Sequence, residues 1–212
     1  MTIEISAFRW VPPFAQGYVK DLRIRWALEE AGLPYRAVLI GGADQASAAY
    51  RRWQPFGQVP AYRDDTVELF ESGAIILHIA AGSAALAPSD TAGRARVSAW
   101  VIAALNSVEP FARYFLEAHD RPGELARRPE VEALLAQRLT ALAAALGDQD
   151  YLEGSFSAGD VIMTTVLREL VESGMLARFP TLDAYRQRCE ARPAFGRALE
   201  AQLQTYRENA PA

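Results

Sequence analysis

The chain has 212 residues, half of them hydrophobic, and a formal net charge of −4 with acidic and basic residues interspersed. The length allows one large domain or two small ones, and the lack of a basic surplus argues against a nucleic-acid-binding protein. No apolar run approaches the roughly 18 residues of a membrane span, the N-terminus lacks the pattern of a signal peptide, and the single cysteine, Cys189, excludes a disulfide within the chain and a multi-cysteine metal site. We expect a cytoplasmic protein that binds no nucleic acid, membrane or metal.

The first fifty residues alternate predicted strands and helices. Hydrophobic alternation predicts a strand over 3–8, and a proline-containing loop follows over 9–17. A helix is expected over about 18–31, with Gly32 ending it. A second strand over 35–40 and a short helix over 45–53 come next. A right-handed crossover would set the two strands parallel.

Residues 54–82 are predicted to form a turn, two short strands and a helix. The X-Pro bond at Val59-Pro60 can be cis, and a cis bond would turn the Val59 N–H and C=O outward to pair with another extended peptide. Strands are expected over 61–63 and 67–70, joined by a tight turn. Ser72 is the predicted N-cap of the following helix, which Gly82 ends.

The start of that helix has the chemistry of a binding site. Free N–H groups at a helix N-terminus suit a small carboxylate, and Glu71 can accept hydrogen bonds from an ammonium group. Together with the exposed edge at Val59, these groups fit a small zwitterionic peptide. Ser72 as a plain cap and Glu71 as an acid favoured by the helix dipole are the alternatives.

Beyond a linker over 83–89, the sequence contains almost no pattern that predicts a strand. A long helical run over 94–117 contains Pro110, where we expect a kink, and a break follows over 119–123. Leucines at helical spacing predict a helix over 129–146. Ser157 and Asp160 form a predicted capping box for the next helix, and helices over 181–191 and 193–208 complete a bundle.

The order of these motifs resembles a known family. Val59-Pro60 followed by Glu71-Ser72 at a helix start is similar to the glutathione-binding half of cytosolic glutathione S-transferases. The segment 23–35 resembles the family's first helix and the beginning of its second strand, and the segments 157–160 and 192–195 resemble landmarks of its helical half. The resemblance implies an α/β thioredoxin-like domain over 1–82 followed by an all-α domain over 89–212.

The resemblance also implies a function. A glutathione transferase of this type joins the glutathione thiolate to a small apolar electrophile, acts in detoxification and forms a homodimer. The residues that would bind glutathione are Gln58, Val59, Pro60, Glu71 and Ser72. The candidates for the electrophile pocket are Trp10, Trp100 and Tyr114.

The group that stabilises the thiolate is the point where the chain departs from the family. Family members usually carry Ser, Cys or Tyr after the first strand, but the loop over 9–17 has no Ser and no Cys. Tyr18, Gln16 or backbone N–H groups remain as donors. Cys189 lies in the helical half and is expected to be a small buried hydrophobic residue. A glutathione-dependent isomerase or dehalogenase, and a non-catalytic glutathione-binding protein, remain as alternatives.

Overall fold

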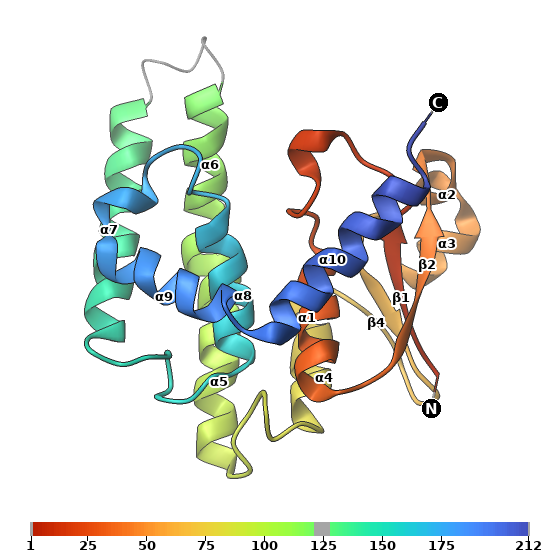
Figure 1. Cartoon of the computed structure of the whole chain (residues 1–212), viewed down its shortest axis with the longest axis horizontal. Helices are drawn as coiled ribbons and strands as arrows, with labels where there is room; N and C mark the ends of the chain where they lie inside the picture. The colour runs from red at the N-terminus through yellow and green to blue at the C-terminus, as the bar shows by residue number, and fades with distance from the viewer. Residues whose placement is uncertain (1, 121–127, 212) are drawn as a thin grey trace. The chain divides into compact units, whose positions relative to one another are not determined.

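The computed structural model describes residues 2–120 and 128–211, which form two compact units (Figure 1). The first unit comprises Met1–Leu86 together with Arg192–Ala212, and the second comprises Ala87–Ala191. The sequence-based division, with domains over 1–82 and 89–212, differs from these units mainly because it assigns the last helix to the helical half.

The first unit contains a mixed sheet of four strands in the order β2-β1-β3-β4. The predicted parallel pairing of β1 (Ile3–Phe8) with β2 (Tyr35–Ile40) is confirmed, and the remaining pairs are antiparallel. Strands β3 (Ala61–Arg63) and β4 (Glu68–Phe70) form the predicted hairpin, although Val67 precedes β4. This is the thioredoxin-like arrangement expected from the sequence.

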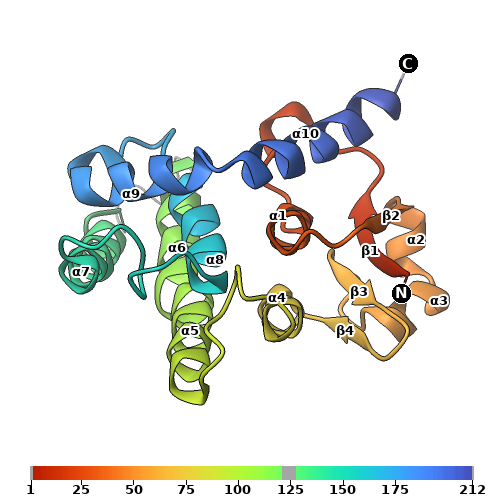
Figure 2. The same ribbon diagram turned by 60° about the horizontal axis from the view of Figure 1, so that its bottom comes forward.

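Helices cover both faces of this sheet. The helices α1 (Asp21–Ala31) and α4 (Ser72–Ala81) lie on one face, and the short helices α2 (Gly42–Ala46) and α3 (Ala48–Trp53) lie on the other (Figure 2). Strand β1 is central, so its residues are buried on both sides, including the polar Glu4 and Ser6. Ile3, Ile5, Trp26 and Ile75 are among the core residues with almost no exposed surface.

Two predicted helices differ from the structure: the first begins later than predicted, and the second is divided into two. The first helix begins at Asp21 and not near Tyr18, because a short 3-10 helix, η1 (Pro13–Ala15), and a turn with Gly17 at φ 83° occupy the preceding residues. The predicted helix over 45–53 is two helices. Ser47 between them is extended, and its side chain accepts a hydrogen bond from the Tyr50 N–H at 3.1 Å, which is the capping behaviour typical of serine.

The last helix, α10 (Pro193–Glu208), runs beside α1 in both views (Figures 1 and 2). Phe195 packs edge-on against Trp26, with ring centroids 4.9 Å apart. Arg192 donates two hydrogen bonds to Glu30, at 2.7 and 2.8 Å. These contacts make α10 part of the first unit.

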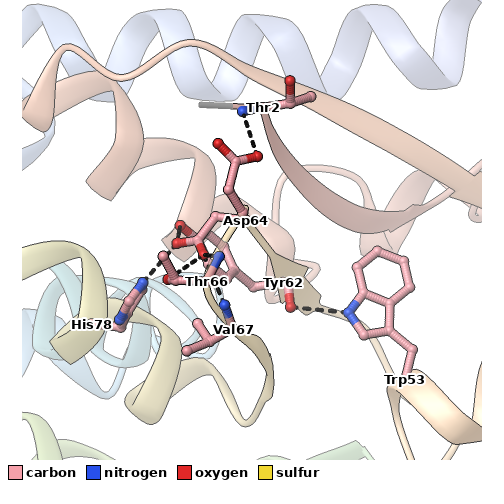
Figure 3. A network of polar contacts seen from close by, with 8 residues as sticks. Thr2, Trp53, Tyr62, Asp64, Thr66, Val67 and His78 are labelled. Carbon is pink, nitrogen blue, oxygen red and sulfur yellow. Dashed lines mark hydrogen bonds and ion pairs between the residues drawn. The ribbon is translucent and has the colours of Figure 1, made fainter.

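The β3–β4 hairpin is tied to α4 through Asp64 (Figure 3). Its carboxylate accepts hydrogen bonds from the Thr66 N–H, the Thr66 hydroxyl, the Val67 N–H and the Tyr62 hydroxyl, at 2.6–2.9 Å. The His78 Nε2 on α4 lies 2.9 Å from the same carboxylate. Burial raises the pKa of Asp64, but the hydrogen bonds from Thr66 and His78 outweigh burial and hold that pKa well below its usual range.

The second unit is helical in all its regular elements among residues 87–120 and 128–191. It contains α5 (Thr91–Ala103), the π-helix η2 (Ala104–Val108), α6 (Glu109–Asp120), α7 (Arg128–Leu146), α8 (Ala158–Arg168), the 3-10 helix η4 (Leu176–Arg178) and α9 (Pro180–Glu190). The π-helix lies near the position where the sequence predicted a kink. It ends at Val108, Glu109 separates it from Pro110, and the Glu109 N–H donates to the Ala104 carbonyl. Such insertions accommodate a residue that lacks an N–H.

The predicted break over 119–123 is only partly described. His119 and Asp120 still belong to α6, so the break does not begin at His119. Residues 121–123 lie outside the described residues. None of the helices in the described part of the chain is long and apolar enough to cross a membrane.

The core of the second unit forms around α8, and the predicted capping box at its start is confirmed. The fully buried Asp160 accepts hydrogen bonds from the Ser157 N–H at 2.8 Å, the Leu152 N–H at 3.0 Å and the Tyr185 hydroxyl at 2.8 Å. Cys189 is fully buried nearby, as expected, and burial raises the pKa of its thiol to about 12. A thiol that stays protonated in this way cannot serve as a nucleophile.

Candidate functional site

The Val59-Pro60 bond is cis, as the sequence predicted. The neighbouring backbone is held by a chain of hydrogen bonds on both sides of this bond. The Ala61 N–H donates to the Ser6 hydroxyl at 2.7 Å, and the Tyr50 hydroxyl, 2.7 Å from Ser6, donates to the Gln58 carbonyl. Since the Tyr50 proton is used on Gln58, the Ser6 hydroxyl must donate to Tyr50. The segment is therefore fixed against β1 and α3.

Val59 combines a buried side chain with unused backbone groups. Its side chain packs with Ile40 and Tyr50 in one hydrophobic cluster. Within the described part of the chain, no hydrogen bond engages its N–H or C=O. An unpaired backbone edge of this kind is suited to pairing with an extended peptide.

The start of α4 differs from prediction by one residue. Glu71 is the N-cap and Ser72 is the first helical residue, because the Glu71 carbonyl accepts the first bond of the helix, from the Ile75 N–H at 3.0 Å. The assignment of Ser72 as N-cap is therefore wrong. Glu71 has φ 69° and ψ 117°, and it is the one non-glycine residue with a positive φ in the ranges 2–120 and 128–211. Such backbone strain concentrates at ligand sites.

Ser72 is buried, whereas Glu71 is exposed. Ser72 is 6% exposed, and its hydroxyl accepts a hydrogen bond from the Arg23 guanidinium at 3.4 Å. The hydroxyl proton of Ser72 stays available for an anion, as do the first N–H groups of α4, which have no partner within the helix. The exposed Glu71 carboxylate stands next to them. The two residues together can receive a group with one negative and one positive charge.

The turn before α1 contacts the same region. Val19 packs against the cluster that contains Val59, and Tyr18, which precedes it, is half-buried. Gln16 is also half-buried, and its side-chain N–H donates to the Val11 carbonyl at 3.0 Å. With the Arg23–Ser72 contact, the structure brings the turn, the Val59 segment and the start of α4 together around the first half of α1.

The three predicted pocket residues are distributed over both units. Trp10 is half-buried in the loop after β1. Trp100, on α5, donates its indole N–H to Glu153 at 3.0 Å, and Tyr114, on α6, is 63% exposed. A pocket that these side chains share remains a prediction.

Sequence reasoning missed Arg23 and Tyr50, which hold Ser72 and Gln58. Arg23 is 2% exposed although it is charged. The sequence signal that could have indicated its burial is its position between the apolar residues Leu22 and Ile24. The contact of Tyr50 with Gln58 is not visible in the sequence, because it depends on how α3 packs on the sheet.

The chain is similar to several known proteins. Residues 22–81 match the family model described as glutathione S-transferase, N-terminal domain. A glutathione S-transferase from Hyoscyamus muticus is 29% identical over 196 residues, which cover 84% of this chain and 92% of that protein. Over residues 22–81 the chain is therefore similar to the N-terminal domain of the glutathione S-transferase family. The matched range contains Val59, Glu71 and Ser72.

Two further proteins extend the comparison. The disulfide-bond oxidoreductase YfcG of Escherichia coli is 28% identical over 200 residues, which cover 85% of this chain and 91% of that protein. The crystal structure of a glutathione transferase from Burkholderia graminis, with two glutathione molecules per subunit, aligns with a TM-score of 0.80 at 24% identity. That alignment covers 94% of this chain and 88% of the other, and it shows the same fold.

Proposed function

We propose that this protein binds glutathione at the start of α4 and joins its thiolate to small apolar electrophiles. The observation that carries the proposal is the convergence around α1 of an unpaired Val59 backbone, a strained Glu71 and a helix N-terminus at Ser72. The γ-glutamyl carboxylate of glutathione would bind the N–H groups and hydroxyl at Ser72, and its ammonium would bind Glu71. The cysteinyl backbone of glutathione would pair with Val59, with Gln58 and Pro60 flanking it.

In the proposed reaction the glutathione thiol loses its proton to solvent, and the thiolate forms a carbon–sulfur bond with the electrophile. A leaving group departs with the electron pair of the bond it loses, or the electrophile simply accepts the addition. The protein must favour the thiolate at neutral pH, since an ordinary thiol is mostly protonated there. Tyr18 is the proposed donor to the sulfur. Gln16 is the second candidate, although one of its amide N–H groups already bonds to Val11.

The remaining parts of the proposal follow the family. Trp10, Trp100 and Tyr114 are proposed to line the electrophile pocket, and the chain is proposed to act as a cytoplasmic homodimer in detoxification. Light scattering at micromolar concentration tests the dimer, because it would give twice the mass of the chain.

Calorimetric titration with glutathione, with turnover of an activated chloronitrobenzene measured alongside, tests the proposal. We expect saturable binding by the wild type and an affinity lower by about fivefold to thirtyfold in Ser72→Ala, which loses a hydrogen bond to a charged group. Ser98→Ala is the matched control, because the hydrogen bond that its hydroxyl makes among the described residues lies within α5, to the Arg94 carbonyl at 2.9 Å. Equal affinities of all three proteins would place glutathione elsewhere, and binding without turnover would favour a non-catalytic protein.

A second candidate function is reduction of disulfides by two glutathione molecules. It is favoured by the likeness to YfcG and by the burial of Cys189, which leaves the protein without a reactive thiol of its own. One bound thiolate would attack the substrate disulfide and release one thiol. The second glutathione would then attack the mixed disulfide, giving the other thiol and glutathione disulfide.

Product analysis separates the two candidates. The protein would be given glutathione with either the chloronitrobenzene or a small dialkyl disulfide. A thioether product identifies a transferase, whereas glutathione disulfide formed only with the dialkyl disulfide identifies a reductase. An isomerase or a dehalogenase would require a different electrophile for its own reaction.

A further inference from the structure

A buried polar cluster joins α10 to the turn that carries Tyr18. Gln202, on α10, is fully buried, and its side-chain N–H groups donate to the Val19 carbonyl at 3.1 Å and to the Asp21 carboxylate at 2.7 Å. Asp21 is the first residue of α1, and its other oxygen accepts from Arg25 at 2.7 Å. One side chain from the end of the chain therefore holds both the turn and the helix start.

Val19 connects this cluster to the proposed glutathione site. Its carbonyl is held by Gln202, while its side chain packs against the cluster that contains Val59. The Leu22 N–H donates to the same carbonyl at 3.0 Å. Tyr18 therefore precedes a residue that is held by three contacts: the Gln202 side chain, the Leu22 N–H and the packing of its own side chain.

This polar cluster lowers the stability of the fold in ways that an apolar contact would not, because it buries a charge and unpaired polar atoms. Asp21 is fully buried, and burial raises the pKa of its carboxyl although Arg25 and Gln202 act against this. The Gln202 Oε1 and the Tyr206 hydroxyl are buried without a hydrogen-bond partner among the described residues. Replacing buried polar groups of this kind by apolar ones is often neutral or stabilising, so stability alone does not account for their presence.

We infer that Gln202 is a positioning residue, which holds the Val19 carbonyl so that the turn over 16–20 presents its donor to the glutathione sulfur. The inference rests on the proposed function, since it concerns the stabilisation of the bound thiolate. It makes the last helix of the chain part of the activating machinery, although Gln202 itself does not touch glutathione. A shift of the turn would move the donor without disturbing Glu71 and Ser72, which hold the other end of the peptide.

The test is the pKa of the glutathione thiol in the complex, followed by thiolate absorbance in the ultraviolet. Gln202→Met keeps the length of the side chain and removes its donors. We expect the bound thiol pKa to rise by about one unit, with about tenfold less turnover at neutral pH and recovery at higher pH. The affinity for S-methylglutathione, which has no thiol, should change by less than about twofold.

Arg197→Met is the matched control on the same helix. Arg197 is exposed and pairs with Glu29 of α1 at 2.7 Å, so this variant weakens the attachment of α10 without touching the turn. We expect an unchanged thiol pKa in Arg197→Met. An unchanged thiol pKa in Gln202→Met, or an equal rise in both variants, would overturn the inference.

Two further outcomes are also decisive. If the wild-type complex shows the thiol pKa of free glutathione, the proposed function fails and the inference fails with it. If Gln202→Met does not fold, Gln202→Lys provides the alternative, because an ammonium group can donate to both Val19 and Asp21. A folded Gln202→Lys protein should retain a lowered thiol pKa, and a thiol pKa equal to that of free glutathione would overturn the positioning role.

Discussion

Glu71 is held in a backbone conformation that suits glycine better than glutamate. Its φ of 69° places the side chain of an L-residue in a crowded region, which costs about 1–3 kcal/mol. In the proposed site this conformation would place its carboxylate beside the N-terminus of α4, where both could contact glutathione. We expect this residue to show a conflict between stability and binding.

The variant Glu71→Gly should therefore be more stable but bind worse. Glycine accepts the backbone conformation without strain, so the free energy of unfolding should rise by about 1 kcal/mol. The affinity for glutathione should fall because the acceptor for its ammonium group is lost. Thermal unfolding and calorimetric titration measure the two effects. Glu71→Gln serves as a control that keeps the backbone strain. A Glu71→Gly protein that binds glutathione as well as the wild type would show that Glu71 does not contribute to binding.

Tyr18 is tested by removal of one oxygen atom. Tyr18→Phe keeps the ring, and a hydrogen bond to a charged acceptor is worth about 1.5–3 kcal/mol. The bound thiol pKa should rise by about one to two units, and turnover at neutral pH should fall about tenfold to a hundredfold. If the thiol pKa and the turnover both stay at wild-type values, Tyr18 only packs, and Gln16 or backbone N–H groups remain as donors.

At the scale of elements, the strands were predictable because their signals are local. Alternating hydrophobic residues defined β1, and the two short stretches on either side of the tight turn defined β3 and β4. The helix starts were not predictable to the residue. The glycine turn before α1 and the serine cap inside the helix predicted over 45–53 are set by small preferences that tertiary contacts decide.

In the candidate site too, some residues could be predicted from local sequence and others depend on tertiary contacts. Val59, Glu71 and Ser72 could be identified in the sequence because their motif is contiguous or closely spaced. Arg23 and Gln202 contact the site from positions far from Ser72 and Val19 in the chain, and no periodicity in one sequence reports such contacts. Their roles follow from packing and become visible only in the structure.

The β3–β4 hairpin should lose stability in acid through Asp64. Its folded pKa lies below its usual value, so its contribution to stability is complete above the ordinary carboxyl pKa of about 3.9 and is lost as the pH falls through the lower folded value. Asp64→Asn should destabilise the protein by about 1–3 kcal/mol at neutral pH and flatten this acid dependence. Denaturant titrations at several pH values measure both effects.

The control for Asp64 is its neighbour. Asp65→Asn alters a carboxylate that accepts a long bond of 3.4 Å from the exposed Thr2 N–H, and it should leave the acid dependence close to that of the wild type. Equal acid profiles for wild type and Asp64→Asn would show that the Asp64 network does not stabilise the hairpin.

At the scale of the whole molecule, the chain returns to its first unit at the end. The Trp26–Phe195 contact, the Arg192–Glu30 pair and Gln202 all join α10 to α1. A fragment that ends at Leu86 would expose Trp26 and leave Asp21 beside Arg25 without cover. We infer that the fold of the first unit requires α10.

We therefore expect a fragment of residues 1–86 to unfold without a cooperative transition. A shortened chain in which a flexible linker joins residues 1–86 to residues 192–212 should unfold cooperatively, with the Trp26 fluorescence of a buried indole. Circular dichroism and fluorescence during denaturant titration measure this difference. A cooperative transition in the 1–86 fragment would show that α10 is dispensable for the fold of the first unit.

Amide NMR during a titration with glutathione tests most directly whether glutathione binds at Val59, Glu71 and Ser72. We predict that the largest shifts fall on the amides of Val59, Ser72 and Gly73, because these N–H groups would gain hydrogen bonds to the ligand. Glycylglycine, a zwitterion without the γ-glutamyl group and the thiol, should shift them far less at the same concentration. Saturable shifts confined to other residues, or equal shifts with both peptides, would contradict the account.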